Sequence, residues 1–216
     1  MNEETNKSFE ELRNCWEASL RERNRNRDFT IISQNCMGGL VYHDLGLQFK
    51  TPTIDLVIRG ENFIRLVENL QEVLSVPAVP GRERIPGENP YPTIWASDVE
   101  VCGFHYPTCA EACEAWNRRR ERVNLNNVFV IANAWDMDDD PALMEKLVRC
   151  SDYKTIVFSD KEYSFPGCFH LPGGFWKRDA EGLLHPNPMD FIPGSYKRYF
   201  EEFFDFVDWL NHGSGF

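Results

Sequence analysis

The stretch from Phe29 to His43 constrains the fold more than any other part of the sequence, because a strand pattern passes through a polar loop into a helical pattern. Residues 29–32 are apolar and partly β-branched, which predicts a short buried strand. Polar residues 33–36 and the pair Gly38–Gly39 follow, and a helical segment begins at Leu40. Proteins of the α/β class bind ligands at such a point, where a strand ends and the next helix presents free N–H groups.

The loop predicts a ligand site, although its sequence matches no specific motif. It is neither a dinucleotide-binding G-x-G-x-x-G nor a P-loop, and it lacks the G-x-S-x-G of a nucleophile elbow. We predict that Ser33, Asn35, Gly38 and Gly39 contact a substrate. The alternative is that the two glycines only allow positive φ angles in a tight turn between strand and helix.

Composition and charge narrow the class of protein. With 216 residues, 42% of them hydrophobic and 26% charged, the chain can bury a sizeable core within one domain. Its net charge of −11 disfavours nonspecific binding to nucleic acid and to anionic lipid. Residues 1–7 are polar and acidic, unlike a signal peptide, and the apolar runs are far too short to span a membrane. We therefore predict a cytoplasmic protein with no transmembrane segment and no nucleic-acid partner.

Segments with strand and helix periodicity alternate along the chain. Residues 1–27 contain an amphipathic helix, and residues 28–216 are predicted to form a single α/β domain with a proline- and glycine-rich loop at 75–93 and a loop-rich region at 160–193. Further strands are predicted over residues 54–58, 98–104, 127–132 and 154–158, and further helices over residues 62–74, 108–121, 141–147 and 195–210. This alternation predicts a mainly parallel or mixed sheet with helices on both faces.

A cysteine and a histidine are candidates for catalysis. Seven cysteines are an odd number in a chain predicted to stay inside the cell, so most should be reduced thiols. Cys36 and His105 each follow a predicted strand and could meet above the sheet, where a helix amino terminus would lower the thiol pKa. Asp98 or Asp44 would orient the imidazole, and His43 is a second possible partner of the thiol. We predict Cys36 and His105 as catalytic residues; the alternative is that both are structural.

Two patterns are similar to metal sites. A set of cysteine and histidine residues lies within twelve residues: Cys102, His105, Cys109 and Cys113. Structural zinc sites usually join two separated pairs of ligands, so small apolar packing is the alternative for this set. Asp136-Met-Asp138 has the D-x-D form with which many glycosyltransferases hold a divalent metal, yet aspartates here also suit the start of a helix at Pro141. We assign no metal ligand and name no cofactor.

Arginines on a predicted helix suggest an anion site. The helix that Thr108 would cap places Trp116, Arg119 and Arg122 nearly on one face. An arginine among apolar side chains is costly without an anion, so Arg119 and Arg122 are predicted to bind a phosphate or a carboxylate. The alternative is that their long side chains lie along apolar surface or pair with an aspartate of the chain.

Several short motifs follow one another between about residues 28 and 160. They are Asn35-Cys36-x-Gly38-Gly39, Tyr42 with Leu45-Gly-Leu47, Thr51-Pro-Thr53, Asp98-Val-Glu100 with His105-Tyr106, Glu111-Ala112, and Trp116-x-x-Arg119-x-x-Arg122-Val-Asn124. This order resembles an uncharacterised bacterial family whose members are often labelled exopolysaccharide or capsular polysaccharide biosynthesis proteins. The resemblance implies a three-layer α/β/α fold, and it adds Tyr106, Trp116 and Asn124 to the predicted substrate-binding residues.

The resemblance implies a pathway, and our first hypothesis is a transferase of cell-surface polysaccharide synthesis that acts on an activated sugar or a sugar-linked substrate. Asn35, Cys36 and the glycine backbone would bind the donor, and His105 would be the general acid or base. One alternative is a thiol hydrolase or acyltransferase. Another is a non-catalytic carbohydrate-binding or pathway-organising protein, whose aromatic residues in 163–176 stack on sugars. The predicted partner is a sugar or nucleotide-sugar-like small molecule, and the oligomeric state stays open.

Overall fold

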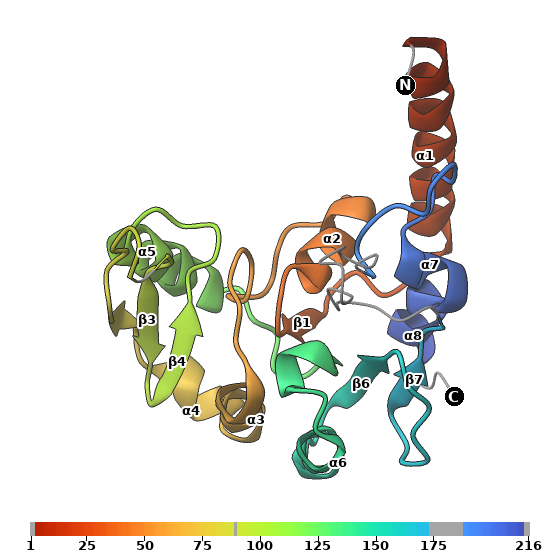
Figure 1. Ribbon diagram of the computed structural model, residues 1–216. Coiled ribbons are helices and arrows are strands. Elements are labelled where there is room, and N and C mark those ends of the chain that lie inside the picture. Colours follow the sequence, from red (N-terminus) through yellow and green to blue (C-terminus); the bar gives the residue numbers. More distant parts are fainter. Residues whose placement is uncertain (1–2, 89, 173–187, 214–216) are drawn as a thin grey trace.

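The computed structural model describes residues 3–88, 90–172 and 188–213, and a parallel sheet of four strands lies within this described part (Figure 1). The strands are β1 (Thr30–Ser33), β5 (Val128–Asn133), β6 (Lys154–Ser159) and β7 (Cys168–His170), in that spatial order. Each neighbouring pair runs parallel. The carboxyl ends of these strands therefore meet at one edge of the sheet.

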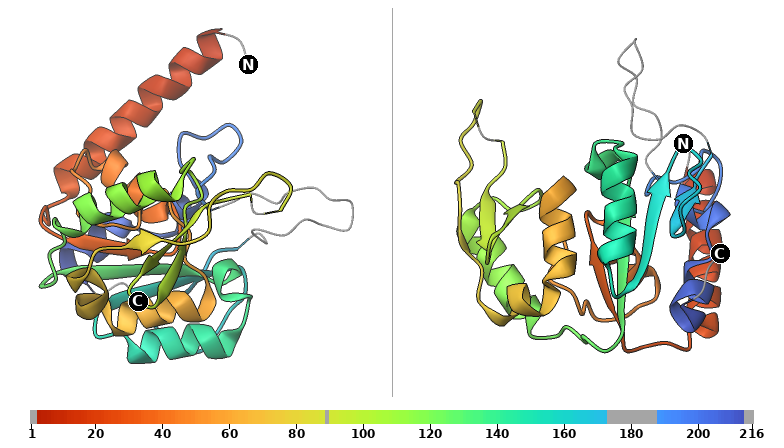
Figure 2. Two further views of the ribbon diagram at one scale, coloured as in Figure 1. Left: turned by 90° about the vertical axis from the view of Figure 1, so that its left-hand side faces the viewer. Right: turned by 90° about the horizontal axis from the view of Figure 1, so that it is seen from below.

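Helices cover both faces of the parallel sheet, because successive side chains of a buried strand point to opposite sides. The helices are α1 (Glu3–Arg23), α2 (Met37–Asp44), α7 (Tyr199–Phe203) and α8 (Phe206–His212) on one face, and α3 (Gly60–Glu68) and α6 (Pro141–Cys150) on the other. Phe129 and Ile131 of β5 pack with α2, α7 and α8 in what we call the first core cluster. Val130 and Ala132 face the other side and pack with α3, α6 and the antiparallel sheet in the second core cluster. Figures 1 and 2 show the strands between these two helical layers. The predicted α/β/α fold is confirmed.

A second, antiparallel sheet stands beside the first. It contains β2 (Val79–Pro80), β3 (Thr93–Ala96) and β4 (Val99–Cys102), and α4 (Leu70–Ser75) and α5 (Cys109–Arg120) pack in the same lobe. The strand predicted over 98–104 is thus present but does not join the parallel sheet. A two-residue turn at Ser97–Asp98, with Ser97 at φ 57°, folds it back on β3. The predicted strand over 54–58 is reduced to an isolated bridge between Val57 and Cys102.

Two predicted helices are interrupted. The helix over 62–74 is divided at Asn69, whose φ and ψ of −117° and 29° are not helical. The helix over 195–210 is divided at Phe204 and Asp205, and the carboxylate of Asp205 accepts the backbone N–H of Asp208 at the start of α8. Apolar periodicity continues through both breaks, so the pattern alone could not place them.

The amino-terminal helix is attached to the body by buried charges. Arg13 of α1 pairs with Asp44 of α2 and with Glu201 of α7, each at 2.6 Å. The first half of α1 projects from the body, with the chain terminus at its far end (Figures 1 and 2). No helix in the described ranges is both long and apolar enough to cross a membrane.

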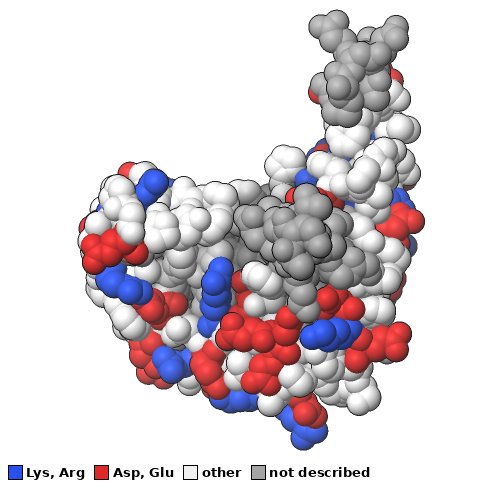
Figure 3. All heavy atoms as spheres, in the orientation of Figure 1, with Lys and Arg blue, Asp and Glu red and all other residues white. Residues whose placement is uncertain are grey.

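The charge on the surface is mixed in sign. Figure 3 shows acidic side chains grouped over the lower part of the face seen in Figure 1, with basic side chains among them. Together with the net charge of −11, such a surface does not favour the phosphate backbone of nucleic acid, and the absence of a nucleic-acid partner stays a prediction.

Candidate active site

A hydrogen-bonded group of polar side chains lies where β1 and β5 end. We call it the strand-end network: Gln34, Asn35, Asn133 and Asp136. Oδ2 of Asp136 accepts a hydrogen bond from Nδ2 of Asn35 and from Nδ2 of Asn133, each at 3.0 Å. Oε1 of Gln34 accepts the backbone N–H of Asn133 at 2.8 Å. These bonds fix the loop after β1 against the loop after β5.

Burial dominates the chemistry of Asp136, whose side chain points into the network. Desolvation raises the pKa of Asp136, and the hydrogen bonds from Asn133 and Asn35 oppose this rise. Nε of the mostly exposed Arg59 lies 3.5 Å from the other carboxylate oxygen. Both oxygens of Asp136 therefore already face donors of the protein. Helix capping was the alternative to metal binding predicted from the sequence for these aspartates. Asp140 does cap a helix, since its carboxylate accepts the Ala142 N–H at 2.8 Å at the amino terminus of α6.

Gly38 and Gly39 lie inside α2, which begins at Met37 and not at Leu40 as predicted. A Cβ atom on Gly38 would come within 2.9 Å of Cγ2 of Ile31, and one on Gly39 within 3.2 Å of Cδ1 of Ile54. Gly38 therefore allows α2 to pack closely on β1, and Gly39 allows it to approach Ile54. Neither glycine has a positive φ angle, so they do not form the tight turn considered as an alternative.

The first N–H groups of α2 are bound by side chains of the protein itself. The Met37 N–H donates to Oδ1 of Asn35 at 3.1 Å, and the Gly38 N–H donates to Oγ of Ser33 at 3.3 Å. An anion at this helix end would have to replace these bonds. Ser33, Asn35 and the two glycines thus have structural roles in the fold, and a contact with substrate stays a prediction.

Asp55 connects residues that the sequence analysis selected. They are Cys36, His105, Tyr106 and Arg119. The Asp55 backbone and carboxylate both influence the pKa of the Cys36 thiol, and the Asp55 carbonyl oxygen accepts the His105 N–H at 3.2 Å. Nη1 of Arg119 donates to the Tyr106 hydroxyl at 2.6 Å, and Nη2 lies 3.8 Å from the Asp55 carboxylate. Residues far apart in sequence therefore meet at one place.

Asp55 has a backbone conformation that few residues adopt. Its φ angle is 63°, in the left-handed region, where a non-glycine side chain is uncommon. Strained backbone is concentrated at functional sites, where surrounding contacts hold it in place. Sequence reasoning passed over Asp55 because the apolar run over 54–58 predicted a regular strand. The available signal was the residue type, since aspartate tolerates this conformation better than most.

An open pocket lies beside Asp55. We call it the Asp55 pocket; it has about 480 Å³ of empty space and is lined by Asp55, Tyr106, Glu111, Glu114, Ala115, Arg118 and Arg119. The guanidinium of Arg119 is mostly buried, with 13% of its side chain exposed, whereas the Asp55 side chain is 46% exposed. The pocket therefore offers a positioned donor beside accessible carboxylates, a combination suited to a polar ligand.

Of the predicted substrate-binding residues, only Tyr106 and Arg119 line this pocket, and three from the same part of the chain lie elsewhere. Trp116 lies fully inside the core, because the face of α5 that carries it packs against the antiparallel sheet. Asn124 lies at the opposite, amino-terminal edge of the parallel sheet, where its N–H donates to Oγ1 of Thr30 at 2.8 Å. Arg122 follows α5, and its backbone N–H donates to the carbonyl of Arg119. One helical turn thus separates Arg122 from the pocket.

Three other residues that the sequence analysis singled out, Cys109, Tyr163 and Phe165, have packing roles. The buried thiol of Cys109 donates to the carbonyl oxygen of Thr93 at 3.1 Å, as expected for a structural cysteine. Tyr163 and Phe165 stack with their ring centroids 5.6 Å apart and pack against the second core cluster. Trp176, the last aromatic residue of the predicted sugar-stacking stretch, lies outside the described residues.

The environment of Cys36 does not favour a reactive thiolate. Burial, with added effects of the Asp55 and Asp136 carboxylates, raises the pKa of the Cys36 thiol to about 11. A catalytic thiol needs the opposite shift. No hydrogen bond joins the Cys36 sulfur to the His105 ring within the described ranges. The thiol-enzyme alternative thus lacks the electrostatic support that it requires.

Alkylation kinetics test the state of Cys36. At pH 7.5 iodoacetamide should modify Cys36 more slowly than the exposed Cys15, because only a very small fraction of the Cys36 thiol is ionised there. The Cys36 rate should rise about tenfold for each pH unit from pH 7 to 9, as the thiolate fraction does. Peptide mass spectrometry measures each rate separately. If Cys36 reacts first at neutral pH, the thiol enzyme returns as the leading hypothesis.

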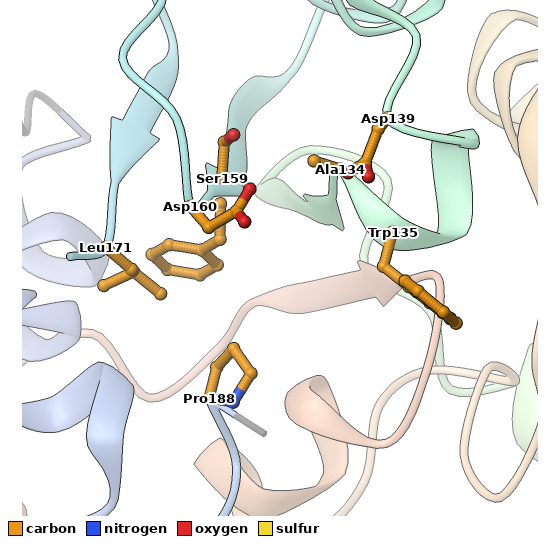
Figure 4. Close-up of a pocket in the computed structure, with 8 residues that line it drawn as sticks. Ala134, Trp135, Asp139, Ser159, Asp160, Leu171 and Pro188 are labelled. Carbon is orange, nitrogen blue, oxygen red and sulfur yellow. The ribbon is translucent and has the colours of Figure 1, made fainter. Parts of the chain in front are cut away.

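A second cavity lies over the ends of β5, β6 and β7. It contains about 250 Å³ of empty space, and Ser159, Asp160, Asp139 and Leu171 are among its lining residues. In Figure 4 the Asp139 and Asp160 side chains approach the cavity from different loops, while the indole of Trp135 points away from it. Because the space open to a ligand in this cavity is much smaller than in the Asp55 pocket, it is less suited to a sugar-sized ligand.

Comparison with known proteins places the chain in a family. A domain described as "Domain of unknown function (DUF1919)" matches residues 7–211. A protein of Haemophilus influenzae, described as "Uncharacterized protein", is 29% identical over 199 residues, which is 90% of this chain and 89% of that protein. Neither description mentions polysaccharide synthesis, so that part of the sequence-based resemblance has no support here. The match spans almost the whole fold, including the strand-end network and the Asp55 pocket, and the chain belongs to the DUF1919 family.

Proposed function

We propose that the protein is a transferase that acts on an activated sugar or sugar-linked substrate, bound in the Asp55 pocket beside the strand-end network. The observation that carries the proposal is the placement of Arg119. Its Nη1 is bound by Tyr106 and by the Ile54 carbonyl, whereas its Nη2 has only the long 3.8 Å approach to Asp55 within the described ranges. A guanidinium held in this way is ready to bind a phosphate or a carboxylate of a ligand.

The side chains around Arg119 suit the sugar part of such a substrate. Asp55, Glu111 and Glu114 present carboxylates at the same pocket, and carboxylates accept hydrogen bonds from sugar hydroxyls. The imidazole of His105 is exposed, while its backbone is tied to the Asp55 carbonyl. Since the next residue, Tyr106, lines the pocket, we assign the His105 imidazole as the general acid or base of the proposed reaction. The choice of a sugar as the substrate class rests on the resemblance of the sequence motifs to polysaccharide biosynthesis proteins.

Ligand-induced stabilisation tests the proposal. A panel of nucleotide sugars and polyprenyl-linked sugars should contain at least one compound that raises the melting temperature by about 5 °C at saturating concentration, since a ligand stabilises the state that binds it. Arg119→Ala should abolish this shift, because the substrate anion then loses its donor. Differential scanning fluorimetry measures the difference between free and ligand-bound protein for each variant, so a lower starting stability does not obscure the result.

Two further variants sharpen this test. Arg149→Ala removes an exposed arginine of α6 that pairs with Glu145, far from the pocket in sequence, and it should leave the shift unchanged. Arg119→Lys should keep part of the shift, since it retains the positive charge. His105→Ala should retain binding but lose turnover. No shift with any compound, or an equal shift in Arg119→Ala, contradicts the proposal, and binding without turnover supports the non-catalytic alternative.

A further inference from the structure

A row of aromatic rings lies at the surface next to the Asp55 pocket. The ring centroids of Tyr91 and Phe104 are 4.5 Å apart, and those of Phe104 and His105 are 4.9 Å apart, edge to face. Tyr91 comes from the loop before β3, whereas Phe104 and His105 come from the connection between β4 and α5. Tyr91 is 36% exposed and Phe104 is 38% exposed. Two separate segments therefore bring large rings together without burying them in the core.

The chain links the row of rings to the pocket through two consecutive residues, His105 and Tyr106. His105 donates its backbone N–H to Asp55, and the next residue, Tyr106, lines the pocket and accepts a hydrogen bond from Arg119. A ligand with its anionic group at Arg119 thus has exposed aromatic surface within reach of its other end. Large exposed apolar side chains gathered beside a polar pocket are typical of a binding surface.

We propose that Tyr91 and Phe104 form a stacking subsite for a pyranose ring, and this inference rests on the proposed function. A pyranose presents C–H groups on its faces and hydroxyl groups at its edge. The faces would pack on the exposed aromatic rings. The hydroxyls would donate to the Asp55 and Glu111 carboxylates, which line the pocket. A nucleobase would also stack, but it offers fewer donors to this pair of carboxylates, so the sugar ring is the better match.

Calorimetric titration tests the subsite with defined probes. The probes are the 1-phosphates of glucose, galactose, mannose and N-acetylglucosamine, the corresponding methyl glycosides, UMP and inorganic phosphate. Phe104→Ala and Tyr91→Ala should each weaken binding of the preferred sugar 1-phosphate about tenfold, the effect of losing one stacking contact. Neither change should alter the binding of inorganic phosphate. Arg119→Ala should weaken the binding of both the sugar 1-phosphate and inorganic phosphate.

Trp95→Ala is the matched control. Trp95 is 40% exposed in the same lobe, on the outer face of the antiparallel sheet, so its loss should leave sugar 1-phosphate binding unchanged. Methyl glycoside binding that depends on Phe104, without any phosphate binding, would preserve the subsite and overturn the proposed function. The subsite is overturned if Phe104→Ala and Tyr91→Ala both leave sugar affinity intact. It is also overturned if UMP but no sugar loses affinity in these variants, or if no sugar binds.

Discussion

Replacing Asp44 by alanine is expected to lower the free energy of unfolding by about 3–5 kcal/mol, because it removes one partner of a buried group of ion pairs. The Asp44 side chain is fully buried, and its Oδ2 lies 2.6 Å from Nη2 of Arg13. Arg198 pairs with the same oxygen. Both arginines are themselves buried and would keep Glu201 as a partner, but the substitution leaves two positive charges with one fewer carboxylate in a poorly solvated place.

Chemical denaturation measures this effect, and an exposed ion pair provides the control. Glu145 pairs with Arg149 on the surface of α6, and Glu145→Ala should change the free energy of unfolding by less than about 1 kcal/mol. Asp44→Ala should also loosen α1, since Arg13 links that helix to α2. Faster amide hydrogen exchange in residues 13–23 would report this. Equal stability losses in the two variants would contradict the buried character of the Asp44 pairs.

Replacing Trp116 by alanine is expected to lower the free energy of unfolding by about 3–5 kcal/mol, the usual loss for a large aromatic residue in a core. Trp116 is fully buried on α5, within the cluster that contains Ile94 and Val101 of the antiparallel sheet. Alanine would leave a cavity between the helix and that sheet. The sequence analysis predicted a substrate contact for Trp116, and the two roles predict different outcomes.

Trp95→Ala serves as the control for Trp116→Ala, since it removes the same side chain from an exposed position. Its expected cost is below about 1.5 kcal/mol, because partly exposed residues bury less apolar surface. Urea denaturation followed by circular dichroism compares the two. Trp116→Ala that loses ligand binding while keeping its stability would show that the core position assigned to Trp116 is wrong.

Three of the four strands of the parallel sheet were predictable, because β1, β5 and β6 are largely apolar runs, whereas β7 lies in residues 160–193, which were predicted to be loop-rich. β5 is buried along its whole length, and β6 is buried from Ile156 to Ser159; such apolar runs predict strands without regard to tertiary structure. The antiparallel hairpin was only half predictable. β4 alternates clearly, but β3 begins inside the proline-rich stretch 75–93, which predicts a loop. Without β3, the strand over 98–104 had no antiparallel partner and was assigned to the wrong sheet.

Some residues of the candidate site could be predicted from the sequence, but which of them lie together could not. His105 was selected because it follows a predicted strand, Arg119 because it shares a helix face with apolar residues, and Tyr106 through the family resemblance. The structure brings all three together around Asp55. Asn124 was selected from the same stretch, yet β1 and β5 place it at the opposite edge of the sheet. Spacing along the chain does not encode which edge a loop reaches until the strand order is known.

The most direct measurement of the central claim is a backbone-amide NMR titration with the compound from the panel that stabilises the protein most. If the Asp55 pocket binds the substrate, the largest shifts should fall on Asp55, Tyr106 and Arg119, and Arg119→Ala should remove them. Ser159 and Asp160, which line the smaller cavity over β5 and β6, should stay unchanged. Shifts confined to those two residues and their neighbours, with none around Asp55, would contradict the account.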